Sequence, residues 1–579
     1  MCGIVGYIGR RDAAPLLIQG LKKLEYRGYD SFGVATVGSD LSVWKKQGKI
    51  SDAEGNAVAL HGHIGIGHTR WATHGAPNDI NAHPHCDCNR RIAVVHNGII
   101  ENYSELKREL AARGHTFVSE TDTEVIAHLL EEEYSGDLLA AVSKTTRRLH
   151  GSYAILAVAK GDERIVAARD KSPLVLGIGD GEIIAASDMT PLLEHTERIV
   201  FLEDGDIVAL TSEKFEISNR GKAVERPVEI VNWCVEDVKK GAFEHYMLKE
   251  IFEQPRVFYE TLRTAADPAV VDMVKRASQV TIVACGTSYH AGMIMKYLFE
   301  GLCRIPVRVE LASEFKYFTP PVKDLVVGVT QSGETADTLA ALRKAKVHNC
   351  PTLAVTNVQG STVTRLADRT LLMRAGPEIG VAATKSFIAQ LAVFMELANA
   401  VCEGELEEML GHAHLAISEA IGGDLAPAVA LCQNAEHIFF VGRGPFYPVA
   451  LEGALKMKEI SYIPAEGYAA GELKHGPFAL LTQKTTVVAI CTPGNTYDVM
   501  KSNIKEMKAR GAPVIAIGTK GDTDLAEIVD VFVPIPETSF LLELLTTSVV
   551  FQLLSYHTAR ALERDIDKPR NLAKSVTVE

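Results

Sequence analysis

The segment Val283-Ala284-Cys285-Gly286-Thr287-Ser288 is matched later in the chain by Phe440-Val441-Gly442-Arg443-Gly444-Pro445. Both segments are apolar runs that lead into glycine and other small residues. Two further pairs keep nearly the same offset along the chain: 329–337 with 490–498, and 351–356 with 513–518. A strand, a glycine or hydroxyl loop and then a helix, repeated within each half, is typical of a parallel doubly wound sheet. The second half of the chain therefore predicts two copies of one α/β domain.

The first 210 residues have a different pattern, with short β-branched runs and only two segments of clear helical periodicity. This pattern predicts an α+β sandwich. A polar stretch with Pro227 follows and predicts a surface extension and a linker. A helix is expected after it, from residue 244 until Pro255 stops it. The resulting expected domains are 1–215 (α+β sandwich), 216–250 (linker), 251–410 and 411–562 (doubly wound α/β domains) and 563–579 (carboxy-terminal tail).

The composition is that of an ordinary folded, soluble protein, with 47% hydrophobic and 23% charged residues among 579. A net charge of −13 argues against nonspecific binding to nucleic acid or to acidic membranes. The ten cysteines are scattered, which favours reduced thiols in the cytoplasm over a disulfide scaffold. The longest apolar region, 388–402, is interrupted by Gln390, Glu396 and Asn399, so we expect a buried helix there and no membrane span.

Cys2 stands where removal of Met1 would make it the first residue. Its α-amino group, with a pKa of about 7.7–8.0, could then take the proton of its own thiol, whose pKa is about 8.5. A nucleophile and a base would thus share one residue. The alternative is a small buried residue at the start of a strand. Position alone favours this alternative, and the segments that follow in the chain favour the nucleophile instead.

Three segments of the first domain carry side chains suited to an amino acid: 67–75, 96–102 and 119–124. They offer an arginine for a carboxylate, an Asn-Gly turn that presents an amide and a backbone N–H, and an acidic residue for an ammonium group. The nearby cluster of His83, His85, Cys86 and Cys88 suggests a metal. Its Cys-x-Cys spacing is too tight for the usual zinc pattern, however, and no second pair follows, so we expect no metal there.

In the first repeat, two loops that open helices are rich in hydroxyl groups, which together with backbone N–H groups favour an anion such as phosphate. Plain helix capping is the alternative for either loop alone. Nucleotide binding is not supported, because the chain has neither a GxxxxGK[ST] sequence nor a GxGxxG with its acidic partner. The loop residues expected to bind phosphate are Thr287, Ser288, Thr330, Gln331, Ser332 and Thr335.

In the second repeat, Glu452, Lys456 and Glu459 are spaced for contact on one helix face. Such groups usually form solvated salt links, but the surrounding apolar residues suggest a buried face, where carboxylates and lysines act as acids and bases. His475 follows in a glycine-flanked loop, where a catalytic and a structural role are equally open. The carboxy-terminal tail lacks low complexity, so we expect it to be docked.

Taken together, these segments closely resemble the family of glutamine–fructose-6-phosphate aminotransferases (isomerising). The resemblance runs from Cys2 to Glu579. It implies a glutaminase domain with an amino-terminal nucleophile, followed by two sugar isomerase domains. The motifs that carry it are CGIVGY (2–7), EYRGYDS (25–31), HTRWATHG (68–75), HNGIIEN (96–102), SETDTE (119–124), QSGET (331–335), EIGVAATK (378–385), LEGALKMKEISY (451–462), GELKHGP (471–477) and KPRNLAKSVTVE (568–579).

For the first domain, the resemblance implies that Cys2 attacks the side-chain amide of L-glutamine, with its own α-amine as the base. Asn97 and Gly98 would form the oxyanion hole. Arg70 would hold the substrate carboxylate and Asp122 its ammonium group. The remaining residues implied are Thr73, His74 and His83 in the pocket, and Trp71 as a gate on an ammonia channel.

For the second half, the resemblance implies that the six hydroxyl and amide residues named above hold the phosphate of D-fructose 6-phosphate. Lys574 would form a Schiff base with the open-chain sugar, and His475, supplied by the neighbouring subunit of a homodimer, would assist ring opening. Glu459 would move a proton from C1 to C2 with support from Lys456, giving glucosamine 6-phosphate. No metal and no organic cofactor is expected.

Three residues depart from the family pattern. Thr330 and Ala383 stand where serine is usual, and Phe32 replaces a small residue near the glutamine site. The change at Ala383 puts one sugar hydrogen bond in doubt. Two other functions stay open: delivery of ammonia to another acceptor such as a phosphoribosyl compound, and a sugar-phosphate sensor without catalysis. The duplicated isomerase pattern disfavours the first, and the joint presence of Cys2, Glu459, His475 and Lys574 disfavours the second.

Overall fold

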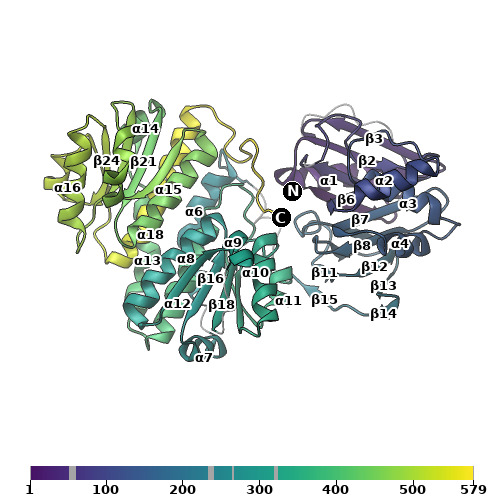
Figure 1. The fold of residues 1–579 in the computed structure, drawn as a ribbon, viewed down its shortest axis with the longest axis horizontal. Helices are drawn as coiled ribbons and strands as arrows, with labels where there is room; N and C mark the ends of the chain where they lie inside the picture. The colour runs from purple at the N-terminus through teal and green to yellow at the C-terminus, as the bar shows by residue number, and fades with distance from the viewer. Residues whose placement is uncertain are drawn as a thin grey trace. The chain divides into compact units, whose positions relative to one another are not determined.

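The computed structural model describes residues 2–50, 60–72, 74–231, 240–263, 267–318 and 324–577. The chain forms two compact units, one of residues 1–239 with 573–579 and one of residues 240–572. Figure 1 shows the first in purple and blue and the second in teal to yellow.

The first unit is a sandwich of two antiparallel sheets. Its inner core consists of aliphatic side chains from both sheets, and a second cluster packs helices against the outer face of the seven-stranded sheet. The eight-stranded sheet has the order β15 (Val228–Ile230), β11 (Arg198–Phe201), β9 (Val175–Ile178), β10 (Ile183–Ala186), β1 (Gly3–Ile8), β4 (Ile64–Arg70), β2 (Ser31–Val37), β3 (Leu41–Gln47). The seven-stranded sheet has the order β14 (Lys222–Val224), β13 (Phe215–Asn219), β12 (Asp206–Leu210), β8 (Ile165–Asp170), β7 (Gly151–Ala159), β6 (Ile92–Ile100), β5 (His85–Cys86). The α+β sandwich is confirmed.

In the described part of this unit, four α-helices cover the sandwich: α1 (Ala13–Leu24), α2 (Tyr103–Ala112), α3 (Glu124–Glu133) and α4 (Leu138–Thr146). The helix α1 lies against β1 and β4, while α3 and α4 lie on the other sheet. Each is amphipathic, and its apolar face is the buried one. The two helices expected from periodicity, 14–24 and 124–133, are therefore confirmed.

The linker expected from residue 216 is wrong in its first half. Residues 215–230 form β13, β14 and β15, which extend the edges of both sheets. Their side chains are mostly partly or fully exposed, as is usual for edge strands, so their polar composition resembled that of a loop. Residues 232–239 of the expected linker lie outside the described residues.

The second unit contains two five-stranded parallel sheets with the same strand order. In each sheet the first strand in sequence lies second in space, beside the strand that follows it and the one after that. The predicted duplication and the doubly wound class are confirmed. The two orders are β17 (Val307–Leu311), β16 (Val280–Ala284), β18 (Leu325–Thr330), β19 (Thr352–Thr356), β20 (Arg369–Leu372), and β22 (Ala465–Ala469), β21 (His437–Gly442), β23 (Thr485–Ile490), β24 (Val514–Thr519), β25 (Val531–Ile535).

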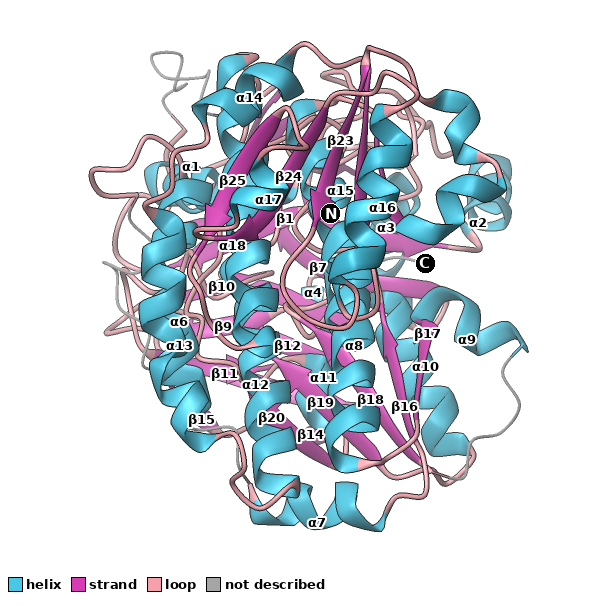
Figure 2. Cartoon of the chain, turned by 90° about the vertical axis from the view of Figure 1, so that its left-hand side faces the viewer, coloured by secondary structure: helices cyan, strands magenta, loops and turns pink. Residues whose placement is uncertain are grey.

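Helices flank both sheets, as the view in Figure 2 shows for α16 and α17 beside β23, β24 and β25. The two repeats share one large apolar core, and each also has a smaller apolar cluster of its own. The helices of this unit are α6 (Tyr246–Leu262), α7 (Pro268–Arg276), α8 (Gly286–Leu298), α9 (Ala312–Phe318), α10 (Ala336–Val347), α11 (Thr362–Leu366), α12 (Lys385–Val401), α13 (Glu407–Ile421), α14 (Ala426–Gln433), α15 (Phe446–Ser461), α16 (Tyr497–Lys508), α17 (Thr523–Ala526) and α18 (Phe540–Ala561).

Two of these helices are strongly apolar. The expected buried helix at 388–402 is confirmed as α12, which is buried along most of its length. Among the described residues, α18 is long and apolar enough to cross a membrane, but 83% of its apolar window is buried inside the structure. It is therefore a core helix of this unit.

The expectation that Pro255 stops a helix is wrong. The helix α6 continues through Pro255 to Leu262. Proline normally leaves the carbonyl four residues before it without a donor. Here Nε2 of Gln254 donates to that carbonyl, the oxygen of Ile251, at 3.0 Å, and also to Oε1 of Gln552 at 2.8 Å. A buried side-chain amide thus replaces the missing backbone N–H.

A residue of the carboxy-terminal tail, Asp567, caps the start of α6. The carboxylate of Asp567 accepts hydrogen bonds from the backbone N–H groups of Tyr246 and Met247, both at 2.9 Å. These are free donors in the first turn of the helix, where a negative charge is also favoured by the helix dipole. Val381 N–H donates to the Asp567 carbonyl at 3.1 Å. The expected docking of the tail is confirmed for this stretch.

We predict that Gln254→Leu destabilises the second unit, because it leaves the carbonyl of Ile251 without a donor. Each buried unsatisfied group costs about 1–3 kcal/mol. In a Pro255→Ala background the backbone N–H of residue 255 returns, so the same substitution should cost measurably less. Urea unfolding followed by circular dichroism measures both losses, with the exposed Gln483→Ala as the control. Equal losses in the two backgrounds would contradict this account.

Candidate active sites

Cys2 lies at the start of β1, in the middle of the eight-stranded sheet. The Trp71 N–H donates to its Sγ at 3.3 Å, so the thiol sits beside the end of β4. Behind it, the N–H of Ile4 donates to Oγ of Ser187 at 3.0 Å, and Ser187 N–H donates to the Ile4 carbonyl at 3.1 Å. The backbone that carries the thiol is therefore held from both neighbouring strands.

Burial raises the pKa of the Cys2 thiol above its ordinary value, and the Trp71 N–H and the positive charge of Arg70 oppose this only in part. A thiol of this kind is mostly protonated at neutral pH. Nucleophilic attack requires the thiolate. A nearby base is therefore needed if Cys2 is to act.

Asn97 and Gly98 were expected in a turn, and this is wrong. They lie inside β6, opposite Ala154 and Tyr153 of β7. Gly98 has φ +129°, and a Cβ there would overlap the Ser152 carbonyl oxygen, so only glycine fits. Nδ2 of Asn97 donates to the Cys2 carbonyl at 2.9 Å, which places this side chain next to Cys2, and its part in an oxyanion hole stays a prediction.

Arg70 and Asp122 are both buried near this end of the sheet. The guanidinium of Arg70 donates to the carbonyls of His74 and of Gly75, the latter at 2.9 Å. The carboxylate of Asp122 accepts from the Ile100 N–H at 2.8 Å. Each side chain is thus oriented by backbone groups, and their contacts with a substrate stay predictions.

The other expected pocket residues have diverse surroundings. Trp71 meets Tyr29 edge to face at 5.7 Å, and His74 meets Tyr103 at 5.4 Å. Nδ1 of His74 is buried without a hydrogen-bond partner among the residues described. Thr73 lies outside the described residues.

A row of buried histidines behind Asn97 was not expected. Nε2 of His68 lies 3.0 Å from the His96 carbonyl, and Nδ1 of His83 lies 2.9 Å from Nε2 of His68. Burial lowers the pKa of His68 to about 3 and that of His83 well below its usual value. These rings are neutral at physiological pH. Only the histidine-rich spacing of 68, 83, 85 and 96 hinted at this row in the sequence.

The expected phosphate-binding residues lie at the carboxyl ends of two neighbouring strands, β16 and β18. Oγ1 of Thr330 lies 2.7 Å from Oγ1 of Thr335, which precedes α10, and Nε2 of Gln390 donates to Oγ of Ser288 at 2.9 Å. Ser332 is buried in the same loop, where its Oγ accepts from the Glu334 N–H. This end of a doubly wound sheet is where such folds bind ligands.

Lys456 is the centre of a buried charge cluster. Its Nζ lies 2.6 Å from a Glu459 carboxylate oxygen, 3.5 Å from Glu452 and 3.2 Å from Oγ1 of Thr287. Lys456 and Glu452 are only 1% and 2% exposed, so the buried alternative for this helix face is confirmed over the solvated one. The hydroxyl of Thr287, on α8, donates to Glu452 at 3.0 Å.

Burial lowers the pKa of Lys456, but the carboxylates of Glu459 and Glu452 outweigh it and raise this pKa above its usual value. Lys456 is therefore an ammonium group at neutral pH. His290 joins the cluster with Nδ1 at 2.7 Å from Glu452. The sequence did not single out His290, because it lies in the other repeat and only the packing of α8 on α15 brings it here.

The last two expected catalytic residues, His475 and Lys574, come later in the sequence than this cluster. His475 ends a short 3₁₀ helix, Ala470–His475, and is exposed. Lys574 is grouped with the first unit. Their parts in the sugar site stay predictions.

Contacts in the structure account for two of the departures from the family pattern. Phe32 is buried, and its ring packs edge to face against Trp44 of β3 at 5.2 Å. Thr330 keeps a hydroxyl group, which contacts the hydroxyl of Thr335. Nothing in the structure explains Ala383.

Two family models match the chain. The glutamine amidotransferase domain matches residues 68–194, and the SIS domain matches residues 273–400 and 431–561. The two SIS matches correspond to the duplicated parallel sheets.

Curated relatives match the whole chain. The glutamine–fructose-6-phosphate aminotransferase (isomerising) of Methanosarcina mazei is 48% identical, and that of Thermus thermophilus 47%, each over 100% of both chains. The chain belongs to this aminotransferase family. Among solved structures, the C-terminal domain of glucosamine-fructose-6-phosphate aminotransferase from Francisella tularensis is 36% identical with a TM-score of 0.54, and the match covers 57% of this chain and 99% of that one.

We predict that Gly98→Ala lowers glutaminase activity by about 10²–10³-fold, the typical effect of a lost oxyanion donor. The added Cβ must push β6 away from β7 and so move the backbone beside Cys2. The matched control is Gly114→Ala, which has φ +99° but no atom within 4 Å of the added Cβ. Glutamate release from glutamine measures both variants. An active Gly98→Ala enzyme would refute the steric argument.

Proposed function

We propose that this chain transfers the amide nitrogen of L-glutamine to D-fructose 6-phosphate and isomerises the product, giving D-glucosamine 6-phosphate and L-glutamate. The observation that carries this proposal is full-length similarity, at 47–48% identity, to relatives named for that reaction. The two candidate sites supply suitable chemistry: a held thiol in one unit, and a buried acid–base cluster beside a hydroxyl-rich loop in the other.

In the glutaminase reaction, the Cys2 thiolate attacks the side-chain amide carbon of glutamine. The negative charge that develops on the amide oxygen is stabilised by Nδ2 of Asn97 and the Gly98 N–H. Ammonia leaves, Trp71 gates its exit, and water hydrolyses the thioester to glutamate. The base is the α-amino group that removal of Met1 exposes on Cys2, which answers the need created by the raised pKa of the thiol.

Glutamine is held by its two ionic groups. Arg70 pairs with its carboxylate and Asp122 with its ammonium group, while Thr73, His74 and His83 complete the pocket. Neutral histidines suit this position, because additional positive charges would repel the substrate ammonium group. The lowered pKa of His83 supports that arrangement.

In the isomerase reaction, the phosphate binds at Ser288, Thr330, Gln331, Ser332 and Thr335. Lys574 forms a Schiff base with the open-chain ketose, and ammonia displaces it at C2. Glu459 then takes a proton from C1 and returns it at C2. The ammonium group of Lys456, 2.6 Å from Glu459, supports each proton transfer. The hydroxyl of Thr287 forms hydrogen bonds with Glu452 and Lys456. Thr287 therefore orients the acid–base cluster and is not one of the phosphate ligands.

The exposed position of His475 supports its donation to the sugar site of a partner subunit. We infer a homodimer on this ground and place the enzyme in the cytoplasm, where fructose 6-phosphate would be available to it.

We predict that Cys2→Ser abolishes glutamine-dependent synthesis but still exchanges the C1 proton of fructose 6-phosphate with deuterated solvent, because Glu459 is untouched. Nuclear magnetic resonance follows the exchange. The intact mass of active wild-type protein should lack Met1. Full activity with Met1 retained would overturn the amine-as-base step.

The converse variant is Glu459→Gln. It should keep glutamate release from glutamine and lower amino-sugar formation by about 10²–10⁴-fold, the usual range for a lost acid–base group. The control is Glu436→Gln, an exposed carboxylate of the same domain. Parallel loss of both activities in Glu459→Gln would argue against this assignment.

A further inference from the structure

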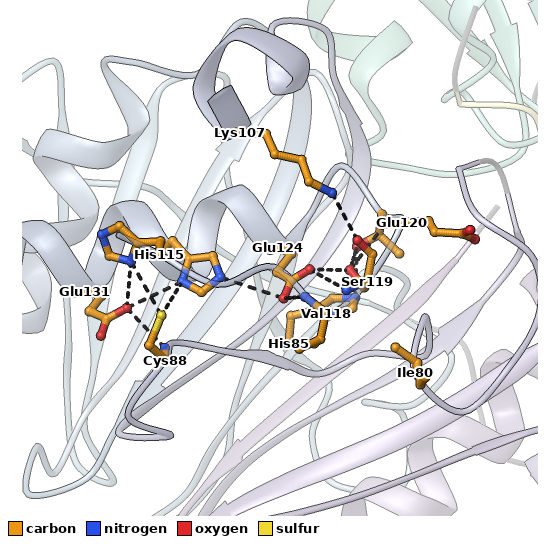
Figure 3. Close-up of polar contacts among 12 residues, drawn as sticks. Ile80, His85, Cys88, Lys107, His115, Val118, Ser119, Glu120, Glu124 and Glu131 are labelled. Carbon is orange, nitrogen blue, oxygen red and sulfur yellow. Dashed lines mark hydrogen bonds and ion pairs between the residues drawn. The ribbon is translucent and has the colours of Figure 1, made fainter. Parts of the chain in front are cut away.

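Four side chains with metal-binding atoms converge in the first unit, away from the residues assigned to glutamine. They are Cys88 after β5, His115 after α2, and His128 and Glu131 on α3, and their ligand atoms all lie within 4.8 Å of one another. Figure 3 shows Cys88, His115 and Glu131 pointing toward a common centre. This set shares only Cys88 with the cluster of His83, His85, Cys86 and Cys88, for which the sequence predicts no metal.

The distances within the set match the edges of a tetrahedron around zinc. With Zn–S near 2.3 Å and Zn–N or Zn–O near 2.0–2.1 Å, these edges are about 3.6 Å from sulfur and about 3.3 Å between the other ligands. The Cys88 sulfur lies 3.7 Å from Nδ1 of His115 and 3.5 Å from Nδ1 of His128. Oε2 of Glu131 lies 3.0 Å and 3.4 Å from the same two nitrogens.

Carboxylates face the far nitrogen of each ring. Nε2 of His115 lies 3.5 Å from Oε1 of Glu132, and Nε2 of His128 lies 3.7 Å from Oε1 of Glu124, which are ion-pair distances and not formed hydrogen bonds. A histidine that directs its Nε2–H to a carboxylate presents a lone pair at Nδ1. Such carboxylate–histidine pairs are the usual support of metal-binding histidines.

With each ring protonated at Nε2, the centre of the cluster would collect lone pairs. Two imidazole nitrogens, a carboxylate oxygen and a sulfur face one another, and His128 is only 1% exposed. A cation at the centre would then compensate the repulsion among these electron-rich atoms. Glu131 is held in place, since its Oε1 accepts from Nδ2 of Asn89 at 2.7 Å and its Oε2, which faces the centre, accepts from the Cys88 N–H at 3.1 Å.

We propose that Cys88, His115, His128 and Glu131 bind one zinc ion per chain. A thiolate with two imidazoles and a carboxylate is a donor set that suits this borderline-soft metal, and four protein ligands make a closed, structural site. The exposed position of Cys88 gives the ion a path from solvent. This site is separate from the proposed aminotransferase reaction.

The zinc would tie α3 to the segment that carries Asp122. Glu124, in the first turn of α3, accepts from the Val118 N–H at 2.9 Å and the Ser119 N–H at 2.7 Å. Nζ of Lys107, on α2, donates to the Ser119 carbonyl at 3.2 Å, and Figure 3 shows these contacts beside the cluster. Metal binding would thus stabilise the connection between α2 and α3.

The test uses the untagged full-length chain, stripped with a chelator and titrated with Zn²⁺ against a competing dye. We expect one tightly bound zinc, and at least about a hundredfold weaker binding in Cys88→Ser, since loss of a supporting group alone costs 10–100-fold. The matched control is Cys86→Ser, two residues away and outside the set, which should bind as the wild type does. Equal binding in Cys88→Ser and wild type would overturn the proposal, as would no binding in wild type.

Two further measurements identify the ligands and check the fold. Co²⁺ in place of zinc should give a near-ultraviolet thiolate charge-transfer band and intense tetrahedral visible bands in wild type and Cys86→Ser, and the charge-transfer band should vanish in Cys88→Ser. Zinc should raise the melting temperature of wild type and Cys86→Ser more than that of Cys88→Ser. Circular dichroism confirms that each stripped variant is folded. A weakly absorbing, octahedral cobalt spectrum in wild type would refute the site.

Discussion

The second unit depends on one interaction, the pairing of the buried ammonium group of Lys456 with two carboxylates. A charge that is 1% exposed is tolerated only when it is paired and hydrogen-bonded, and Glu452, Glu459 and Thr287 supply those partners. Because Thr287 and His290 come from the first repeat and the three charged residues from the second, the cluster forms only when the repeats are packed together. The shared apolar core has the same consequence.

In the glutaminase unit, a comparable constraint acts on the thiol of Cys2. Cys2 precedes a central strand whose two neighbours fix its backbone, and the histidines behind it are neutral because burial lowers their pKa values. A central strand has little freedom to move. The sheet therefore holds the Cys2 thiol in a fixed position.

Local patterns in the sequence predicted the helices and strands in which apolar residues recur with a clear period. The helix at 124–133 and the strands around residues 92, 153 and 207 follow directly from apolar spacing, and the duplication follows from matched strand and loop segments. The prediction failed where a side-chain hydrogen bond or strand pairing overrides a local preference. Gln254 supplies the donor that Pro255 lacks, and pairing with β7 keeps Asn97 and Gly98 in a strand instead of a turn.

The site residues also divide into those that the sequence could predict and those that it could not. Residues such as Cys2, Lys456 and Glu459 could be chosen from motifs that lie within one segment. His290 could not, since only the packing of α8 on α15 brings it to Glu452. The set of Cys88, His115, His128 and Glu131 is similar, because its members come from three separate parts of the chain.

The capping of α6 by Asp567 has a consequence for how the protein is made. Domains generally fold in order as they leave the ribosome. The helix α6 opens the second unit, yet the carboxylate that satisfies its first N–H groups belongs to Asp567, more than 300 residues later in the sequence. The first helix of the isomerase unit therefore stays uncapped until residue 567 has been made. Nascent chains that lack this residue would have an unfinished second unit.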